Sequence, residues 1–168
     1  MIIVSACLLG LNTKYDGTTN AHALLQKYCA SGKFIPVCPE QLGGLGTPRV
    51  PVEIVDGTGQ DVLLGRCQVR GEQGEDVSSQ FIQGAKEVIK IAEMVTVTAA
   101  ILKERSPSCG VNHIYDGSFT HQKKPGQGVT AAFLREHNIP IYSEEDLDEA
   151  KLVDLLNDDE RDSQRVVP

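Results

Sequence analysis

The sequence has 168 residues, of which 40% are hydrophobic and 5% aromatic, so it can bury one core but not two. No segment approaches the roughly 18 consecutive apolar residues that a transmembrane helix needs, and the first residues lack the basic region of a signal peptide. We therefore expect a cytoplasmic protein with no membrane partner. In that reducing compartment its five cysteines are expected to be thiols or metal ligands and not a disulfide framework.

The formal charge of −7 arises from the C-terminal end. Residues 143–168 contain ten of the 23 acidic residues and three of the 16 basic ones, whereas residues 1–142 are neutral. An acidic segment repels phosphates, so general nucleic-acid binding is not expected. We divide the chain into an α/β domain over residues 1–142 and an acidic C-terminal helix or tail over residues 143–168.

Strand and helix patterns alternate along the chain without an internal repeat, which is typical of an α/β fold. A first apolar run over residues 1–7 predicts a strand, and Asn20 can cap a helix over residues 21–31. A second strand is predicted over residues 34–38. Residues 41–49 are too rich in glycine for a regular element and predict a loop.

Two short β-like segments, over residues 50–55 and 61–69, predict a hairpin beside the main sheet. Apolar residues then recur every three or four positions from Asp76 to Val95, which predicts the strongest helix of the chain. A strand over residues 97–102 follows and leads into the segment that contains Cys109.

The last third of the domain begins with a predicted loop over residues 110–128, rich in Gly, His and Lys. A helix over residues 129–137 and a short strand over residues 139–142 follow. The acidic end opens with a capping-box pattern at Ser143 and predicts a helix that frays towards Pro168. The predicted fold is a single Rossmann-like three-layer α/β domain with a mostly parallel sheet and a small β-hairpin extension.

Three cysteines, Cys7, Cys38 and Cys109, each come just after a predicted strand. Ligands of open α/β sheets bind outside the carboxyl ends of the strands, so these thiols would share one sheet edge and form a plausible metal-ligand set. They also adjoin loop-forming and polar residues, where a buried apolar cysteine gains little. Cys29 and Cys67 lie within apolar patterns, and we interpret them as core cysteines.

Sulfur-rich ligand sets select zinc, copper(I) or iron–sulfur clusters. The chain has no CxxC spacing, so it matches neither zinc ribbons nor the common ferredoxin pattern. From the residues alone, a catalytic zinc and a cluster with one iron that lacks a protein thiol both stay open. Either centre would leave a coordination position for chemistry.

Several short segments occur in a specific order along the chain: Ser5-Ala-Cys7-Leu-Leu-Gly10, Tyr15-Asp16-Gly17 with Asn20, Cys38-Pro-Glu40 with the glycines and Pro48-Arg49 after it, Leu102-Lys103, and Ser106-Pro-Ser-Cys109-Gly110. Through these segments, most of residues 1–142 resembles the bacterial family that includes the thiouracil desulfidases. The resemblance implies an enzyme that removes sulfur as sulfide from a thiolated pyrimidine, with a [4Fe-4S] cluster held by Cys7, Cys38 and Cys109. One iron would lack a protein ligand and would bind the substrate's sulfur.

Addition of water to a ring carbon needs a base near the attacking oxygen and a proton source near the heteroatom. Glu40, two residues after Cys38, is the candidate base, although an ordinary solvated carboxylate is the alternative. Ser106, three residues before Cys109, is the candidate hydroxyl that relays the proton and orients the base, and a turn cap before Pro107 is its alternative.

Four further residues are predicted to bind substrate: Asp16, Arg49, Lys103 and Ser108. Asp16 could bond a pyrimidine edge, although Asp-Gly is also a turn signal. Arg49 and Lys103 could hold a phosphate or polarise a carbonyl. His113 and His121, in the loop after Cys109, could line the mouth of the pocket.

A free thiolated base, a nucleotide and a thiolated RNA residue all stay open as the substrate, and the neutral charge of residues 1–142 fits a small molecule better. Two other functions stay open. One is a non-catalytic metal or iron–sulfur binding module, such as a carrier or sensor. The other is a zinc hydrolase that uses the same cysteines.

Overall fold

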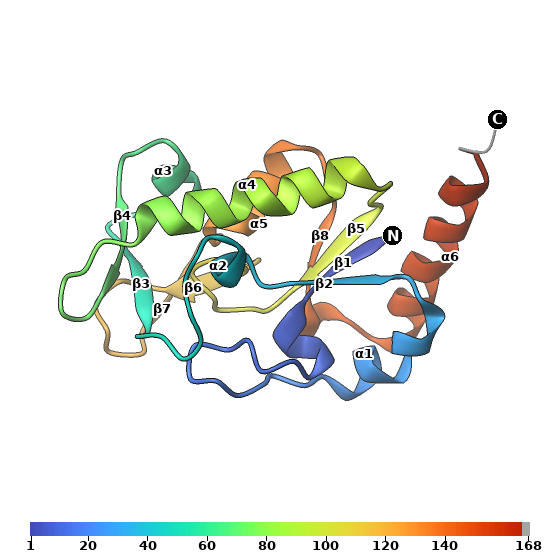
Figure 1. The fold of residues 1–168 in the computed structure, drawn as a ribbon, viewed down its shortest axis with the longest axis horizontal. Coiled ribbons are helices and arrows are strands. Elements are labelled where there is room, and N and C mark those ends of the chain that lie inside the picture. Colours follow the sequence, from blue (N-terminus) through green and yellow to red (C-terminus); the bar gives the residue numbers. More distant parts are fainter. Residues whose placement is uncertain (166–168) are drawn as a thin grey trace.

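Parallel strands form the central sheet of the computed structural model, which describes residues 1–165 (Figure 1). The strands are β1 (Ile2–Ser5), β2 (Phe34–Val37), β5 (Ala99–Leu102) and β8 (Ile141–Ser143), in the order β2-β1-β5-β8. Every neighbouring pair is parallel. All residues of β1 and β5 are buried, because helices cover both faces of the sheet. This confirms the predicted class of fold.

Successive residues of the central strands point to opposite faces. On one face, Ile3 of β1 packs with Ala100 and Leu102 of β5 against α4 (Ser78–Met94) and α5 (Val129–Glu136). Their shared core contains the helix residues Val88, Ile89, Ala131 and Leu134.

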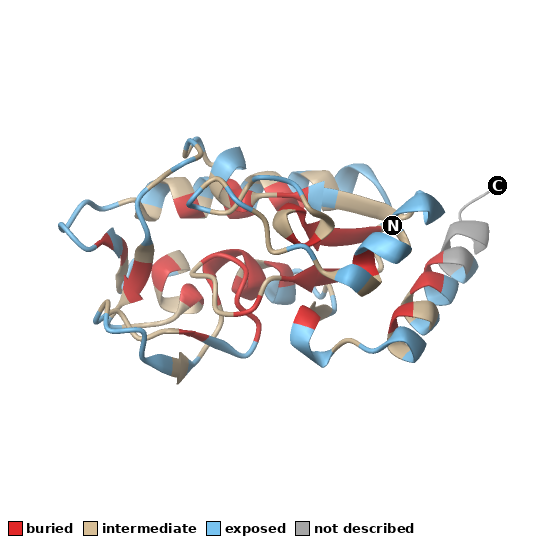
Figure 2. Cartoon of the chain, turned by 90° about the horizontal axis from the view of Figure 1, so that it is seen from below, coloured by how far each residue is buried: buried red, intermediate tan, exposed pale blue. Residues whose placement is uncertain are grey.

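The opposite face of the sheet packs against α1 (Ala23–Lys27) and α6 (Glu149–Arg165). Leu152 and Leu156 of α6 are buried there, and the outward side of this helix is exposed (Figure 2). Glu149 ties α6 to α1 through an ion pair, with 2.6 Å between its Oε1 and the Nζ of Lys27. The predicted fraying at Pro168 lies outside the described residues.

An extension between β2 and β5 packs a third hydrophobic cluster beneath the antiparallel hairpin of β3 (Val52–Val55) and β4 (Gln68–Gly71). The hairpin confirms the predicted extension. Its connection differs from the expected strand, because α3 (Gly59–Leu63) occupies the start of the range 61–69. Thr58 and Asp61 form a capping box, in which the backbone N–H of Thr58 donates to Asp61 Oδ2 at 3.0 Å, and this local pairing starts a helix.

Three other local predictions are corrected. α1 begins after His22 and not after Asn20, whose backbone N–H instead donates to Cys7 O at 3.0 Å. A second hairpin, β6 (His113–Tyr115) with β7 (Lys123–Pro125), lies inside the predicted loop.

The third correction concerns the start of the acidic helix. Ser143 caps only a 3-10 turn over Glu144–Asp146, with 3.1 Å between its Oγ and Glu145 N. α6 starts later, because Asp148 Oδ1 accepts the N–H of Lys151 at 2.8 Å and so caps the helix.

Glycines allow a close approach of α4 to α2 (Pro39–Leu42), a short helix that opens the glycine-rich segment after β2. A Cβ placed on Gly84 would lie 1.9 Å from Pro39 O, and one on Gly43 would lie 2.0 Å from Gln80 O. Both atoms belong to backbone that cannot rotate away. The position of α2, and of the residues it carries, therefore depends on these glycines.

We expect Gly84→Ala to lower the free energy of unfolding by about 1–3 kcal/mol, because the added methyl overlaps backbone in a packed interface. Chemical denaturation measures this change. Lys86→Ala, at an exposed position of the same helix, is the matched control. At a helix position with free space, Gly→Ala stabilises a protein by up to about 1 kcal/mol, so a stabilised Gly84→Ala variant would contradict the close contact.

Candidate active site

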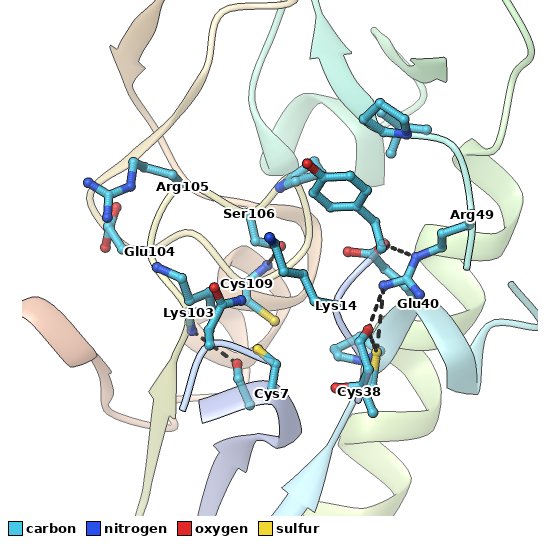
Figure 3. A pocket seen from close by; sticks show the side chains of 18 of the residues that line it. Cys7, Lys14, Cys38, Glu40, Arg49, Lys103, Glu104, Arg105, Ser106 and Cys109 are labelled. Carbon is cyan, nitrogen blue, oxygen red and sulfur yellow. Dashed lines mark hydrogen bonds and ion pairs between the residues drawn. The ribbon is translucent and has the colours of Figure 1, made fainter. Parts of the chain in front are cut away.

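A cavity of about 420 Å³ opens at the carboxyl ends of β1, β2 and β5, and Cys7, Cys38 and Cys109 all line it (Figure 3). Cys7 lies in a 3-10 turn directly after β1, Cys38 joins β2 to α2, and Cys109 lies in the loop after β5. In the strand order β2-β1-β5-β8, the connections change direction between β1 and β5, where ligands of such sheets bind. The structure thus brings the three predicted thiols to one edge.

Each of these thiols has a hydrogen-bond donor beside it. The polar side chain of Asn20 lies beside Cys7 and that of Ser5 beside Cys109, and each acts to lower the pKa of its thiol. The Nη2 of Arg49 lies 3.9 Å from the Sγ of Cys38. These donors stabilise negative charge on sulfur, which is the form in which cysteine binds a metal.

Burial acts against that charge. Loss of hydration raises the pKa of the Cys7 and Cys109 thiols, and the neighbouring donors only partly oppose this effect. Thiols in such a cavity keep their protons until a positive centre compensates the thiolate charge, and metal binding then releases those protons. The donor set, the burial and the sulfur chemistry therefore fit a thiolate-bound metal centre.

The three thiols reach the cavity from three separate segments of the chain. Among residues 1–165, no group of three or more His, Cys, Asp or Glu side chains is arranged to hold a single metal ion. A tetrahedral zinc with bonds of about 2.3 Å would require sulfurs roughly 4 Å apart. A single zinc ion at this site would therefore require the three thiols to move closer together.

Cys29 and Cys67 lie away from this cavity. Cys67 is half-buried, and its Sγ lies 3.7 Å from Thr58 O. Cys29 is exposed, which corrects its interpretation as a core residue. The helix that would have buried it ends at Lys27, and Cys29 starts a separate 3-10 turn.

Glu40, in the first turn of α2, lines the cavity and forms an ion pair with Arg49. The Nε of Arg49 lies 2.6 Å from Glu40 Oε2, and the two side chains are only 9% and 13% exposed. The other carboxylate oxygen, Oε1, has no hydrogen bond among the described residues. Glu40 is therefore a fixed, charge-compensated carboxylate with one oxygen left for a ligand or water.

Arg49 uses all five of its N–H donors within the protein. Besides Glu40 and Cys38, its partners are Gly46 O, Thr47 Oγ1 and Thr13 O, at 3.3, 2.9 and 3.0 Å. This geometry favours a positioning role over the predicted contact with a substrate phosphate. Arg49 joins the candidate base to the segment around Cys38.

Ser106 lines the cavity and also caps the turn that carries Cys109. Its Oγ accepts the N–H groups of Ser108 and Cys109 at 3.1 and 3.0 Å. The hydroxyl proton stays available for donation. Ser108 is fully buried, lies 2.9 Å from Thr130 Oγ1 and packs the loop behind Cys109, so it does not reach the cavity.

The two remaining predicted substrate-binding residues differ in their placement. Lys103 lines the cavity, but its Nζ forms an ion pair with the buried Glu144. Asp16 is exposed outside the cavity lining and closes a turn, with 3.0 Å between its Oδ1 and Thr18 N. Bonds from Lys14 and Thr18 hold the pKa of Asp16 at about 2.

Of the two loop histidines, only one lines the cavity. His121 lines the cavity and contacts the ring of Tyr115 edge-on, with 6.3 Å between ring centroids. His113 is exposed and does not line it.

Sequence reasoning missed two buried glutamates that line the cavity. Glu104 accepts the backbone N–H groups of Val111, Asn112 and His113, the closest at 2.6 Å. Glu53 accepts those of Gly117 and Phe119. Except for His113 at the start of β6, the partners lie outside helices and strands, and those of Glu53 are 64 and 66 residues away along the chain. No local sequence pattern could therefore indicate these bonds.

Together the fold and the site define an α/β protein with a thiol-lined cavity at the switch point of its sheet. Residues 2–146 match the model of the 2-thiouracil desulfurase family, and the chain belongs to this family. The match confirms the resemblance carried by the motifs and the class of enzyme that it implied. None of the helices among residues 1–165 is long and apolar enough to span a membrane.

Two relatives cover nearly the whole chain. "Uncharacterized protein YbbK" of Bacillus subtilis (strain 168) is 42% identical over 149 residues, which are 89% of this chain and 99% of that protein. Among solved structures, the chain is similar to the [4Fe-4S]-dependent thiouracil desulfidase TudS, with 39% sequence identity and a TM-score of 0.79. The similarity covers 92% of this chain and 97% of TudS.

Proposed function

We propose that this protein is a [4Fe-4S]-dependent desulfidase that removes sulfur, as sulfide, from a thiouracil-like base. The observation that carries the proposal is the meeting of Cys7, Cys38 and Cys109 around one cavity at the sheet edge. The family match and the similarity to TudS support the same activity. The reaction exchanges sulfur for oxygen: C=S and H₂O give C=O and H₂S, without net oxidation or reduction.

Cys7, Cys38 and Cys109 would bind three of the four irons as thiolates. When bound, the cluster supplies an open iron that acts as a Lewis acid towards the thiocarbonyl sulfur. The donors Asn20, Ser5 and Arg49 beside the three sulfurs would stabilise the thiolates.

Glu40 would take a proton from the attacking water through its unpaired Oε1, while Arg49 holds Oε2 in place. Ser106 would donate a proton on the side of the pyrimidine from which the sulfur leaves. Its oxygen already accepts two backbone N–H bonds, and its hydroxyl hydrogen is free to donate. Both residues line the cavity with the cysteines, so all the groups of this mechanism border one volume.

The test is anaerobic reconstitution with iron and sulfide, followed by incubation with 2-thiouracil. We expect sulfide and uracil to appear in equal amounts, and only with the cluster-loaded protein. A protein that holds the cluster but releases no sulfide from 2-thiouracil, 4-thiouracil or their nucleotides would support a carrier or sensor and overturn the enzyme.

Asn20→Ala removes the donor beside Cys7 and leaves the three thiols in place. Loss of a residue that bonds a metal ligand typically costs 10–100-fold in metal affinity. We therefore expect the variant to lose its cluster faster to an iron chelator, followed by the decay of visible absorption. Asn12→Ala, at an exposed position of the same loop, should behave like the wild type, and equal decay in both variants would contradict the role of Asn20.

A further inference from the structure

Glu53 of β3 is a buried carboxylate on the wall of the active-site cavity, only 8% exposed. Its Oε2 accepts the backbone N–H groups of Gly117 and Phe119 at 2.9 and 3.2 Å. The cation opposite it in the hairpin, Arg70, bonds the side chain of Gln68 instead. No ion pair of Glu53 occurs among the described residues, so its charge is held only by backbone amides.

The three glutamates of the cavity differ in what they leave free. Glu104 has both oxygens occupied, because Oε1 and Oε2 each accept backbone N–H groups. Glu40 has a cationic partner in Arg49. Glu53 has no cationic partner, and backbone N–H groups occupy only its Oε2. Its Oε1 makes no hydrogen bond among the described residues.

A carboxylate at a dry protein wall is costly unless donors satisfy its oxygens. Oε1 of Glu53 makes no hydrogen bond in the described part of the chain, yet this oxygen is not fully buried. It therefore remains accessible, and the residue borders the cavity. Such an oxygen is suited to a ligand that brings an N–H group.

We propose that Oε1 of Glu53 accepts a hydrogen bond from a ring N–H of the thiolated pyrimidine and so selects bases that are unsubstituted at that nitrogen. This inference rests on the proposed function. A pyrimidine that carries a thiocarbonyl in place of a carbonyl presents ring N–H donors next to the reacting carbon. A buried carboxylate that meets such a donor favours it strongly over an N-alkylated ring.

The same carboxylate also links the substrate to the loop over the cavity. Oε2 holds Gly117 and Phe119, and the loop around them carries Tyr115 and His121 into the cavity lining. A substrate bonded to Oε1 and a loop bonded to Oε2 share one rigid group. Binding of the ring and ordering of this loop should therefore favour each other.

The experiment compares Glu53→Gln with the wild type, both cluster-loaded. Glutamine keeps an oxygen for the two backbone amides but presents an NH₂ group to the ring. The NH₂ group and the ring N–H are both donors, so they cannot form a hydrogen bond. We expect KM for 2-thiouracil to rise about 10–100-fold, the range for a lost hydrogen bond to a charged group, while kcat changes less than threefold. Binding of uracil, measured by equilibrium dialysis, should weaken by the same factor.

Substrates methylated at one ring nitrogen make the test specific. Wild-type protein should discriminate against the isomer whose methyl replaces the contacted N–H, and Glu53→Gln should lose that discrimination. Glu104→Gln is the matched control, because it alters a carboxylate whose oxygens are both occupied by backbone. It should leave the discrimination between methylated and unmethylated bases unchanged.

Failure of this inference and failure of the proposed function look different. If the wild type releases sulfide and Glu53→Gln keeps both its KM and its discrimination, Glu53 has only a structural role and the inference is overturned. If the wild type binds uracil but releases no sulfide, the desulfidase function fails, and the uracil affinity of Glu53→Gln still decides the role of the carboxylate. A wild type that neither binds uracil nor releases sulfide overturns both.

Discussion

Cys38→Ala abolishes sulfide release and bleaches the anaerobically reconstituted protein, if Cys38 is one of three cluster ligands. The reason is the small number of ligands: three thiols border the cavity, and two of them cannot retain a four-iron cluster with comparable strength. Iron and sulfide content, visible absorption and sulfide release should fall together to background. Cys7→Ala and Cys109→Ala should give the same result.

The chain contains its own controls for this experiment. Cys29→Ala and Cys67→Ala remove a thiol of the same chemistry outside the cavity, and both should keep the iron content and the activity of the wild type. If loss of iron is equal in Cys38→Ala and Cys29→Ala, the ligand assignment is wrong. A colourless protein that binds zinc would point to the hydrolase alternative.

Glu40→Gln is expected to lower kcat by about 10² to 10⁴, the usual contribution of a general base, and to leave the cluster in place. The amide cannot accept the proton of the attacking water, while α2 and the three cysteines are unchanged. The measurement is kcat under anaerobic conditions, with the visible spectrum and iron content determined on the same samples.

Glu93→Gln removes an equal charge from an exposed position of α4 and should keep full activity. Retention of the wild-type kcat by Glu40→Gln would exclude the carboxylate as the base and favour a module whose open position only exchanges ligands. Loss of iron together with activity would instead mean that Glu40 acts on the cluster site, through Arg49 and Cys38.

The central strands and the cysteines that follow them could be predicted because their signals are local. Buried parallel strands are continuous apolar runs, and α/β sheets place ligands beyond the carboxyl ends of those runs. This was sufficient to separate Cys7, Cys38 and Cys109 from the other two cysteines. It also pointed to Glu40 and Ser106, which are neighbours of those thiols in sequence.

The same local reasoning failed where two signals competed. Ser143 and the acidic residues after it match a capping box, yet Asp148 caps the helix five residues later. Residues 61–69 contain apolar side chains typical of a strand, but the bond from the backbone N–H of Thr58 to the Asp61 side chain starts a helix there. In both places one side-chain hydrogen bond decided the boundary, and several residues nearby could have formed it.

Composition, strand periodicity and motif spacing determine the class of fold, the sheet edge and the identity of the three thiols. The tertiary structure alone decides which partner each polar side chain finds: Arg49 with Glu40, Asn20 with Cys7, and Glu53 with amides 64 and 66 residues further along the chain. A hydrogen bond requires two atoms within about 3 Å, and periodicity carries no information about distances between remote segments. The chemistry that the cavity permits therefore depends on how the loops fold over the sheet.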